Sequence, residues 1–178
     1  MTQRFGHVVM EPSESTAQRH RVLLVEDQPS LVEWVRQALA QEQDLELLVC
    51  MDAASAVDKA HRVRPSVILQ DLVMPNKGGF ELLSDYRAEA DLSDIPVVVL
   101  SALDNVSEKV RAFSLGAADY LVKLPNRVEF VARVRAHALA HATRRELRET
   151  KEELRLIADH FDVRLQPHAR ARLAGGGP

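Results

Sequence analysis

Polar residues with complementary chemistry follow four short apolar runs of the sequence. Glu26 and Asp27 follow residues 22–25, Asp71 follows residues 66–70, Ser101 follows residues 97–100, and Lys123 follows residues 118–122. If these runs are strands of an open parallel sheet, their carboxyl ends lie along one edge, where ligands bind. Three carboxylates, a hydroxyl and an ammonium group would then share one pocket. We therefore predict a divalent-metal site that contains a reactive carboxylate.

This set of groups fits phosphoryl transfer to a carboxylate. Carboxylate oxygens are hard ligands that suit Mg²⁺, so Glu26 and Asp27 are predicted to hold Mg²⁺ together with Asp71. A carboxylate is also a competent nucleophile that forms an aspartyl phosphate, and Asp71 is the candidate. Ser101 would donate its hydroxyl, and Lys123 would neutralise charge on the transferred oxygens, as cations do in such reactions.

Each of these residues also has an ordinary structural interpretation. The first two acids could cap the helix that follows them. Asp71 could cap a turn, Ser101 could bond its own loop, and Lys123 could be a solvated surface charge. The chemical interpretation is favoured because these groups stand at the ends of four different predicted strands.

The composition narrows the class of protein. The chain has 178 residues, of which 46% are hydrophobic and 4% aromatic, so one domain with an aliphatic core and an appendage is expected. A net charge of −3 gives no electrostatic reason to expect nucleic acid as a partner. No apolar stretch approaches the ~20 residues of a membrane span, and the start of the chain lacks an apolar signal core. The lone cysteine, Cys50, is expected to be a small buried side chain, and a cytoplasmic protein is predicted.

Short aliphatic runs alternate with helical patterns along most of the chain. Strands are predicted near 21–25, 46–50, 66–70, 96–100 and 118–122, and helices near 29–42, 53–63, 78–89 and 105–115. Runs that are apolar throughout indicate parallel strands buried on both faces. The alternation predicts an α/β fold with a doubly wound five-stranded parallel sheet. Residues 1–20 are polar without a sustained period and are predicted to form a disordered tail.

Local signals support the predicted helix starts. Pro29 suits a first helical position, where its missing N–H costs no hydrogen bond. Asp52 precedes a helical pattern and is predicted to cap it. Asn105 with Glu108 and Asn126 with Glu129 have the spacing of capping boxes, in which each side chain bonds the backbone of the other residue.

The last helical pattern is much longer than the others, and its second half is too charged to be core. In a heptad register, the a positions are Leu147, Leu154 and Phe161, and the d positions are Thr150 and Ile157. Glu146 takes a g position and Lys151 the following e position, so the two can form an ion pair between the two chains. We therefore predict a domain over 21–140, a helical stalk over 141–163 and a disordered tail over 164–178. The apolar seam formed by these a and d positions predicts a parallel homodimer through residues 143–161. The alternatives are a solvated helix and one that folds back on its own domain.

Taken together, the motifs resemble the receiver domain of bacterial two-component response regulators. The matching segments are 25–27, 71–75, 101–102 and 119–123, and the resemblance covers about residues 21–140. It implies a flavodoxin-like sheet with strand order 2-1-3-4-5. It also implies a phospho-acceptor module rather than an enzyme, in which Asp71 takes a phosphoryl group from a histidine kinase or a phosphotransfer protein.

The resemblance further implies a metal site. Asp27, Asp71 and the main-chain carbonyl of Val73 would ligate Mg²⁺, and Glu26 would contact it through water. Members of the family more commonly have Asp at the position of Glu26. The extra methylene of Glu26 still allows a water-mediated contact.

The resemblance also implies a switch. Ser101, which replaces a frequent Thr, would move to bond the phosphoryl oxygens, Lys123 would pair with them, and Tyr120 would turn inward after Ser101. The fourth helix, fifth strand and fifth helix would form the surface that changes, with output through the helical tail. The family's usual proline is displaced by one position, to Lys123-Leu124-Pro125. Because a cis bond before Leu costs about 3 kcal/mol, this displacement disfavours a cis peptide after Lys123.

Two segments, 69–75 and 120–125, resemble the receivers of Wsp-type diguanylate cyclases, in which a helical stalk leads to a GGDEF catalytic domain. No GGDEF or GGEEF string occurs in this sequence. The chain is therefore interpreted either as the N-terminal part of such a cyclase or as a free-standing receiver that acts by protein–protein interaction. An aspartyl-phosphate phosphohydrolase of haloacid-dehalogenase type is disfavoured, because Val73 stands where those enzymes have a second aspartate.

Overall fold

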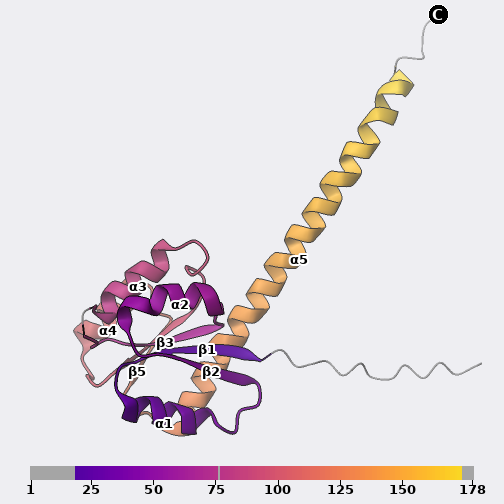
Figure 1. Cartoon of the computed structure of the whole chain (residues 1–178). Helices are drawn as coiled ribbons and strands as arrows, with labels where there is room; N and C mark the ends of the chain where they lie inside the picture. The colour runs from indigo at the N-terminus through magenta and orange to yellow at the C-terminus, as the bar shows by residue number, and fades with distance from the viewer. Residues whose placement is uncertain (1–18, 76, 174–178) are drawn as a thin grey trace, which may run out of the picture.

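The structure is a computed structural model that describes residues 19–75 and 77–173, with side chains described up to residue 160. Strands and helices alternate along this part of the chain (Figure 1). In chain order the elements are β1 His20–Val25, α1 Pro29–Leu39, β2 Leu45–Cys50, the 3₁₀ turn η1 Ala53–Ser55, α2 Ala56–Val63, β3 Val67–Asp71, α3 Gly79–Ala88, β4 Val97–Ser101, α4 Val106–Ser114, β5 Asp119–Val122 and α5 Arg127–Leu173.

The five strands form one parallel sheet in the order β2-β1-β3-β4-β5, which confirms the predicted fold. Helices α1 and α5 cover one face, and α2, α3 and α4 cover the other (Figure 1). Strand β3 lies between β1 and β4, and all five of its residues are buried. The carboxyl ends of β1, β3, β4 and β5 therefore lie along one edge of a covered sheet.

Alternate residues of the strands supply two aliphatic cores. In β1, Leu23 and Val25 face the core under α2 and α3, whereas Val22 and Leu24 face the core under α1 and α5. Each strand is thus apolar on both sides, as parallel strands sandwiched between helices must be. The predicted strands and helices are all present, and their ends differ from the predicted ends by three residues or fewer up to α4.

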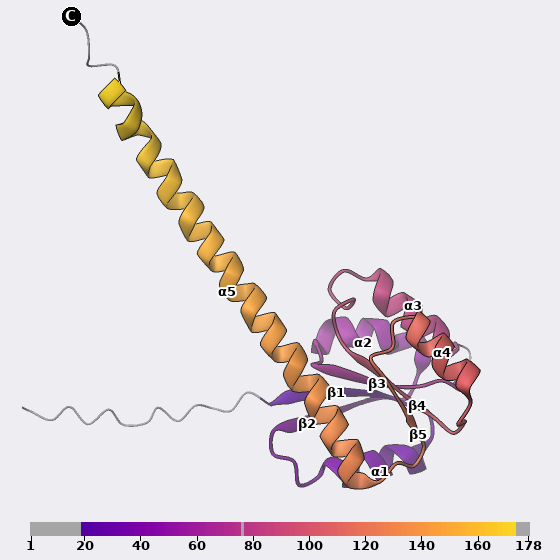
Figure 2. The same ribbon diagram turned by 180° about the vertical axis from the view of Figure 1, so that it is seen from behind.

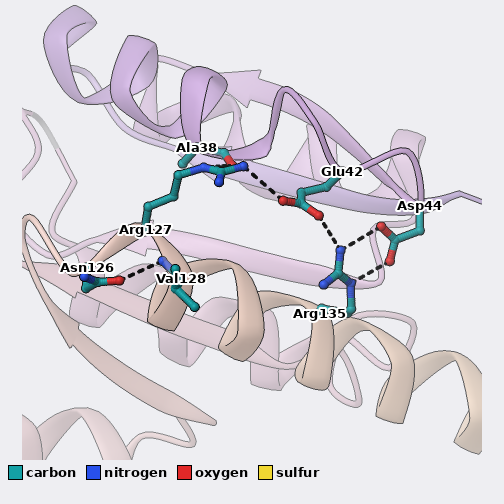
Figure 3. A network of polar contacts seen from close by, with 7 residues as sticks. All are labelled: Ala38, Glu42, Asp44, Asn126, Arg127, Val128 and Arg135. Carbon is teal, nitrogen blue, oxygen red and sulfur yellow. Dashed lines mark hydrogen bonds and ion pairs between the residues drawn. The ribbon is translucent and has the colours of Figure 1, made fainter.

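Ionic contacts fix the first turns of α5 against the loop that joins α1 to β2 (Figure 3). Arg127 donates to the carbonyl of Ala38 at 3.0 Å and to Glu42 at 3.1 Å. Arg135 reaches Glu42 at 2.6 Å and forms a two-pronged contact with Asp44 at 2.8 and 3.0 Å. Exposed ion pairs are weak singly, but two guanidinium groups that share Glu42 join α5 to this loop at two points along the helix.

The caps form largely as predicted. Pro29 is the first residue of α1, Asp52 accepts a hydrogen bond from the N–H of Ala54, and Asn126 accepts one from the N–H of Val128 at 2.8 Å. The predicted capping box at Asn126 is half wrong, because Glu129 pairs with Arg133 one helical turn later instead of bonding back. An i,i+4 guanidinium partner competes successfully for that carboxylate.

Helix α5 leaves the domain as a single extended rod (Figure 2). Its contacts with the domain extend past the predicted boundary at residue 140, because His141 is buried and Arg148 pairs with Asp94 in the loop before β4. The helical backbone continues to Leu173, whereas we predicted a disordered tail from residue 164. Continuing an existing helix adds one hydrogen bond per residue without a new nucleation cost.

The two ends of the chain fall partly outside the structure. Strand β1 begins at His20, inside the predicted tail, and residues 1–18 and 174–178 lie outside the described residues. In the part that the structure describes, no helix has both the length and the apolar character needed to cross a membrane.

Candidate phospho-acceptor and metal site

Three carboxylates meet where β1 and β3 end. Glu26 and Asp27 follow the last residue of β1, and Asp71 is the last residue of β3. One oxygen from each lies within 4.8 Å of the others. Glu26 is 0% exposed and Asp71 is 1% exposed, while Asp27 is partly buried. The structure thus brings together the predicted acidic set.

Lys123, directly after β5, supplies positive charge to this cluster. Its Nζ lies 2.9 Å from Oε2 of Glu26 and 2.8 Å from Oδ1 of Asp71. The other oxygen of Glu26 accepts the N–H of Gln28 at 3.1 Å. One ammonium group therefore pairs with two of the three carboxylates, and the ionised cluster has an excess of negative charge.

Burial of Glu26 opposes its ionisation. Desolvation raises the pKa of Glu26, and the nearby charge of Asp71 raises it further, against the lowering effects of Lys123 and the Gln28 N–H. Within the described part of the chain, Oδ1 of Asp27 and Oδ2 of Asp71 are buried and have no hydrogen-bond partner. Buried charges need a partner or a metal. Carboxylate oxygens without a partner are suitable hard ligands for a divalent cation such as Mg²⁺.

The backbone at Asp71 leaves no room for a side chain on Gly79. A Cβ built on Gly79 would lie 2.3 Å from the Asp71 carbonyl oxygen and 2.6 Å from the Cα of Leu72. The N–H of Gly79 donates to the Leu72 carbonyl at 3.1 Å. In the structure, Gly79 begins α3 and brings the helix against the end of β3.

Ser101 and Tyr120 are both tied to Leu103, in the loop after β4. The buried Oγ of Ser101 accepts the N–H of Leu103 at 3.2 Å, so the ordinary turn role of Ser101 is present in this structure. The hydroxyl of Tyr120, which is largely buried, donates to the Leu103 carbonyl at 2.8 Å. The two predicted switch residues are thus linked through one loop residue.

The displaced proline leaves the conformation of the peptide after Lys123 open, and in the structure the bond between Lys123 and Leu124 is cis. The N–H of Lys123 donates to the Ser101 carbonyl at 2.7 Å, so tertiary contacts define this segment. Val73 lies in the loop after β3 with an exposed side chain, and the metal role of its carbonyl stays a prediction.

Asp119, at the start of β5, connects the strand to α5, a link that the sequence did not suggest. Its carboxylate accepts the N–H of Tyr120 at 2.8 Å, Arg133 at 2.9 Å and His137 at 3.2 Å. Burial opposes its ionisation, but these donors outweigh the burial and hold the pKa of Asp119 below its usual value. The residue next to Tyr120 is therefore fixed to the helix that leaves the domain.

Comparison with known proteins agrees with this geometry. The family model of the response regulator receiver domain matches residues 22–135. The transcriptional regulatory protein TrcR of Mycobacterium tuberculosis is 39% identical over 116 residues, which are 65% of this chain and 44% of TrcR. The chain spans about half the length of the curated relatives it matches.

Solved structures also resemble this one. The receiver domain of a LuxO repressor protein from Vibrio parahaemolyticus has a TM-score of 0.67 and 27% identity, and the match covers 72% of this chain and 97% of that one. The Mn²⁺-bound form of the response regulator Rcp1 has a TM-score of 0.57 and 30% identity, with coverage of 66% and 90%.

Neutralising Asp27 is expected to stabilise the protein in the absence of divalent cations. Asp27→Asn removes one negative charge from a cluster in which three carboxylates outnumber one ammonium group. A gain of about 1 kcal/mol in the free energy of unfolding would raise the Tm by roughly 2–4 °C. It should also abolish the rise in Tm that Mg²⁺ causes in the wild type, which mass action requires of a bound ligand. Thermal melts in chelator and in Mg²⁺ check this, with the exposed Asp91→Asn as the control. A lower Tm for Asp27→Asn in chelator would contradict it.

Gly79→Ala should destabilise the domain, whereas Gly78→Ala should not. The new Cβ at residue 79 meets main-chain atoms of Asp71 and Leu72 that cannot yield cheaply, and overpacking of this kind costs about 1–3 kcal/mol. At Gly78, no atom in the described part of the chain lies within 4 Å of the place that a Cβ would take. Urea denaturation of the two variants tests the close approach of Gly79 to the main chain of Asp71 and Leu72. Equal midpoints for the two variants would contradict it.

Proposed function

The chain belongs to the response regulator receiver domain family, and from this we propose that Asp71 accepts a phosphoryl group from the phosphohistidine of a histidine kinase or a phosphotransfer protein. The phosphorus–nitrogen bond would break, and a bond from phosphorus to a carboxylate oxygen of Asp71 would form. The observation that carries the proposal is the buried cluster, in which Lys123 bridges Asp71 and Glu26 while Oδ2 of Asp71 lacks a partner within the described residues.

We assign Mg²⁺ to the same cluster. Asp27 and Asp71 would bind it directly with the Val73 carbonyl, and Glu26 would contact it through water. When bound, Mg²⁺ would neutralise charge on the transferred oxygens. The partnerless oxygens of Asp27 and Asp71 support this role, as does the similarity to Rcp1, whose matching structure is a Mn²⁺-bound form.

The protein's own groups would stabilise the phosphorylated state. Lys123 would shift from the free carboxylate of Asp71 to the phosphoryl oxygens, and Ser101 would exchange the Leu103 N–H for a phosphoryl oxygen. Because Tyr120 bonds the carbonyl of Leu103, such a movement would also act on β5. A full shift between two states needs about 5.5 kcal/mol, which several charge-assisted hydrogen bonds can supply.

The proposed output runs through α5. Asp119, next to Tyr120, bonds Arg133 and His137 on α5, so a change in β5 would reach the helix that leaves the domain. The surface made by α4, β5 and α5 would then change together. This path is a proposal for regulation by phosphorylation and assigns no catalytic activity to the domain.

Beyond the domain, we propose that α5 forms a parallel homodimer through residues 143–161. Leu147 and Leu154 are 54% and 60% exposed, and Ile157 lies on the same stripe of the helix. Basic residues Arg144 and Lys151 flank this stripe on one side, and acidic residues Glu146 and Glu153 flank it on the other. In a parallel pair, each basic flank faces the acidic flank of the second copy. Phe161, the last a position, has its side chain outside the described residues.

We propose two candidate outputs for a signal that reaches α5. The long helix is favourable for passing a signal to a following domain, and a diguanylate cyclase of the Wsp type is one such arrangement. A free-standing receiver that acts through the dimer is the other. The curated relatives include DNA-binding regulators such as MtrA of Mycolicibacterium smegmatis.

Asp71→Asn should abolish covalent labelling by acetyl phosphate, because an amide cannot replace the nucleophilic carboxylate. Intact-protein mass spectrometry in Mg²⁺ measures the added phosphoryl group, and Asp91→Asn serves as a control that should label like the wild type. Undiminished labelling of Asp71→Asn, with the phosphoryl group on another residue, would rule out the assignment.

Leu147→Asp combined with Leu154→Asp should lower the association state of the full chain. Each change places a charge on the apolar stripe, where burial against a second copy would be costly. Light scattering measures the mass, and Leu156→Asp is the matched control because Leu156 is 66% exposed on another side of the helix. Equal masses for the two variants would reject the seam.

A further inference from the structure

Two buried polar side chains lie beside Asp71 but outside the acidic cluster. Gln70, the residue before Asp71 in β3, and Tyr86, in α3, are both 0% exposed. Tyr86 belongs to the aliphatic core between the sheet and α3. Placing an amide and a phenol in such a core is costly unless both are hydrogen-bonded. The hydrogen-bond partners of these two side chains therefore indicate which part of the structure they hold in place.

The bonds lead to the main chain of Asp71 and to the loop after it. Nε2 of Gln70 donates to the Asp71 carbonyl at 2.8 Å and lies 3.7 Å from the sulfur of Met74. Oε1 of Gln70 accepts the hydroxyl of Tyr86 at 3.1 Å. Tyr86 thus orients the amide of Gln70, and the amide holds the carbonyl of Asp71.

The same carbonyl is confined by a second contact. Gly79, the first residue of α3, approaches so closely that a Cβ there would lie 2.3 Å from the Asp71 carbonyl oxygen. The Gly79 N–H also bonds the carbonyl of Leu72 at 3.1 Å. The amide of Gln70 and the start of α3 together leave the main chain at Asp71 little freedom to rotate.

We propose that Gln70, oriented by Tyr86, is a positioning residue that fixes the main chain from Asp71 to Met74. It thereby sets the direction of the Asp71 carboxylate and the place of the Val73 carbonyl. This inference rests on the proposed function, because it concerns how the same site receives Mg²⁺ and the phosphoryl group. The simpler alternative is that Gln70 and Tyr86 satisfy each other in the core and have no effect on the site.

Three variants of the full chain separate these alternatives. Tyr86→Phe leaves Oε1 of Gln70 unpaired but retains the donor to Asp71. Gln70→Met removes the donor and leaves the Tyr86 hydroxyl unpaired. The combination of Gln70→Met with Tyr86→Phe removes both polar groups of the pair, so that only the Asp71 carbonyl loses its Gln70 donor.

The measurements are the affinity for Mg²⁺ alone, by calorimetry, and the Tm in chelator. We expect Tyr86→Phe to melt lower than the wild type yet bind Mg²⁺ with equal affinity. The double variant should melt about as low as Tyr86→Phe, since each leaves one buried acceptor without its donor, but bind Mg²⁺ about fivefold to tenfold more weakly. Leu69→Met, in the opposite core, controls for repacking of β3 and should bind Mg²⁺ normally. If Gln70→Met fails to fold, Gln70→Asn, whose amide is one methylene shorter, replaces it.

Equal affinities for the wild type and the double variant would overturn the inference, as would losses of affinity that follow the losses of Tm across all variants. Labelling of the wild type by acetyl phosphate distinguishes this failure from that of the proposed function. A wild type that binds Mg²⁺ and is labelled at Asp71, with an unaffected Gln70 variant, rejects the positioning role alone. A wild type that neither binds Mg²⁺ nor is labelled rejects the proposed function, and the positioning role with it.

Discussion

The ammonium group of Lys123 lies between two carboxylates that are almost completely withdrawn from water, and the arrangement of the site depends on this contact. Its Nζ is 2.9 Å from an oxygen of Glu26 and 2.8 Å from an oxygen of Asp71, with Asp27 close by. Carboxylates this close to one another favour protonation unless a cation is present. Lys123 compensates part of the charge, so a cation that binds the remaining oxygens would stabilise the folded state.

The rest of the fold serves to hold these groups at one edge. Parallel strands bring Glu26, Asp71 and Lys123 together from three separate parts of the sequence, and Gly79 allows α3 to begin directly against β3. Leu103 then bonds both Ser101 and Tyr120, so the loop after β4 is in contact with the site and with β5. Through these contacts, a local change of charge has a continuous physical route toward α5.

The sequence predicted the parts of this arrangement that depend on regular patterns. Apolar runs located the strands. Because the carboxyl ends of parallel strands share one edge, the strand positions were enough to predict that the acidic residues lie near Lys123. The pairing of Gln70 with Tyr86, and of Asp44 with Arg135, could not be predicted, because these contacts join segments whose relative positions follow from the packing of whole helices. Local preferences also left the peptide conformation after Lys123 open and placed the end of the long helix before residue 164, whereas the structure has a cis bond after Lys123 and a helix that continues to Leu173.

The most direct test of the cation site is to locate a divalent cation in crystals soaked with Mn²⁺, by anomalous diffraction at the manganese edge. We predict a peak within coordination distance of Asp27 and Asp71, with Lys123 still paired to the cluster. Mn²⁺ takes oxygen ligands much as Mg²⁺ does, so it is a suitable stand-in. A saturating soak that shows Mn²⁺ only at other carboxylates, or none at this edge of the sheet, would contradict the claim that the buried acids form a cation site.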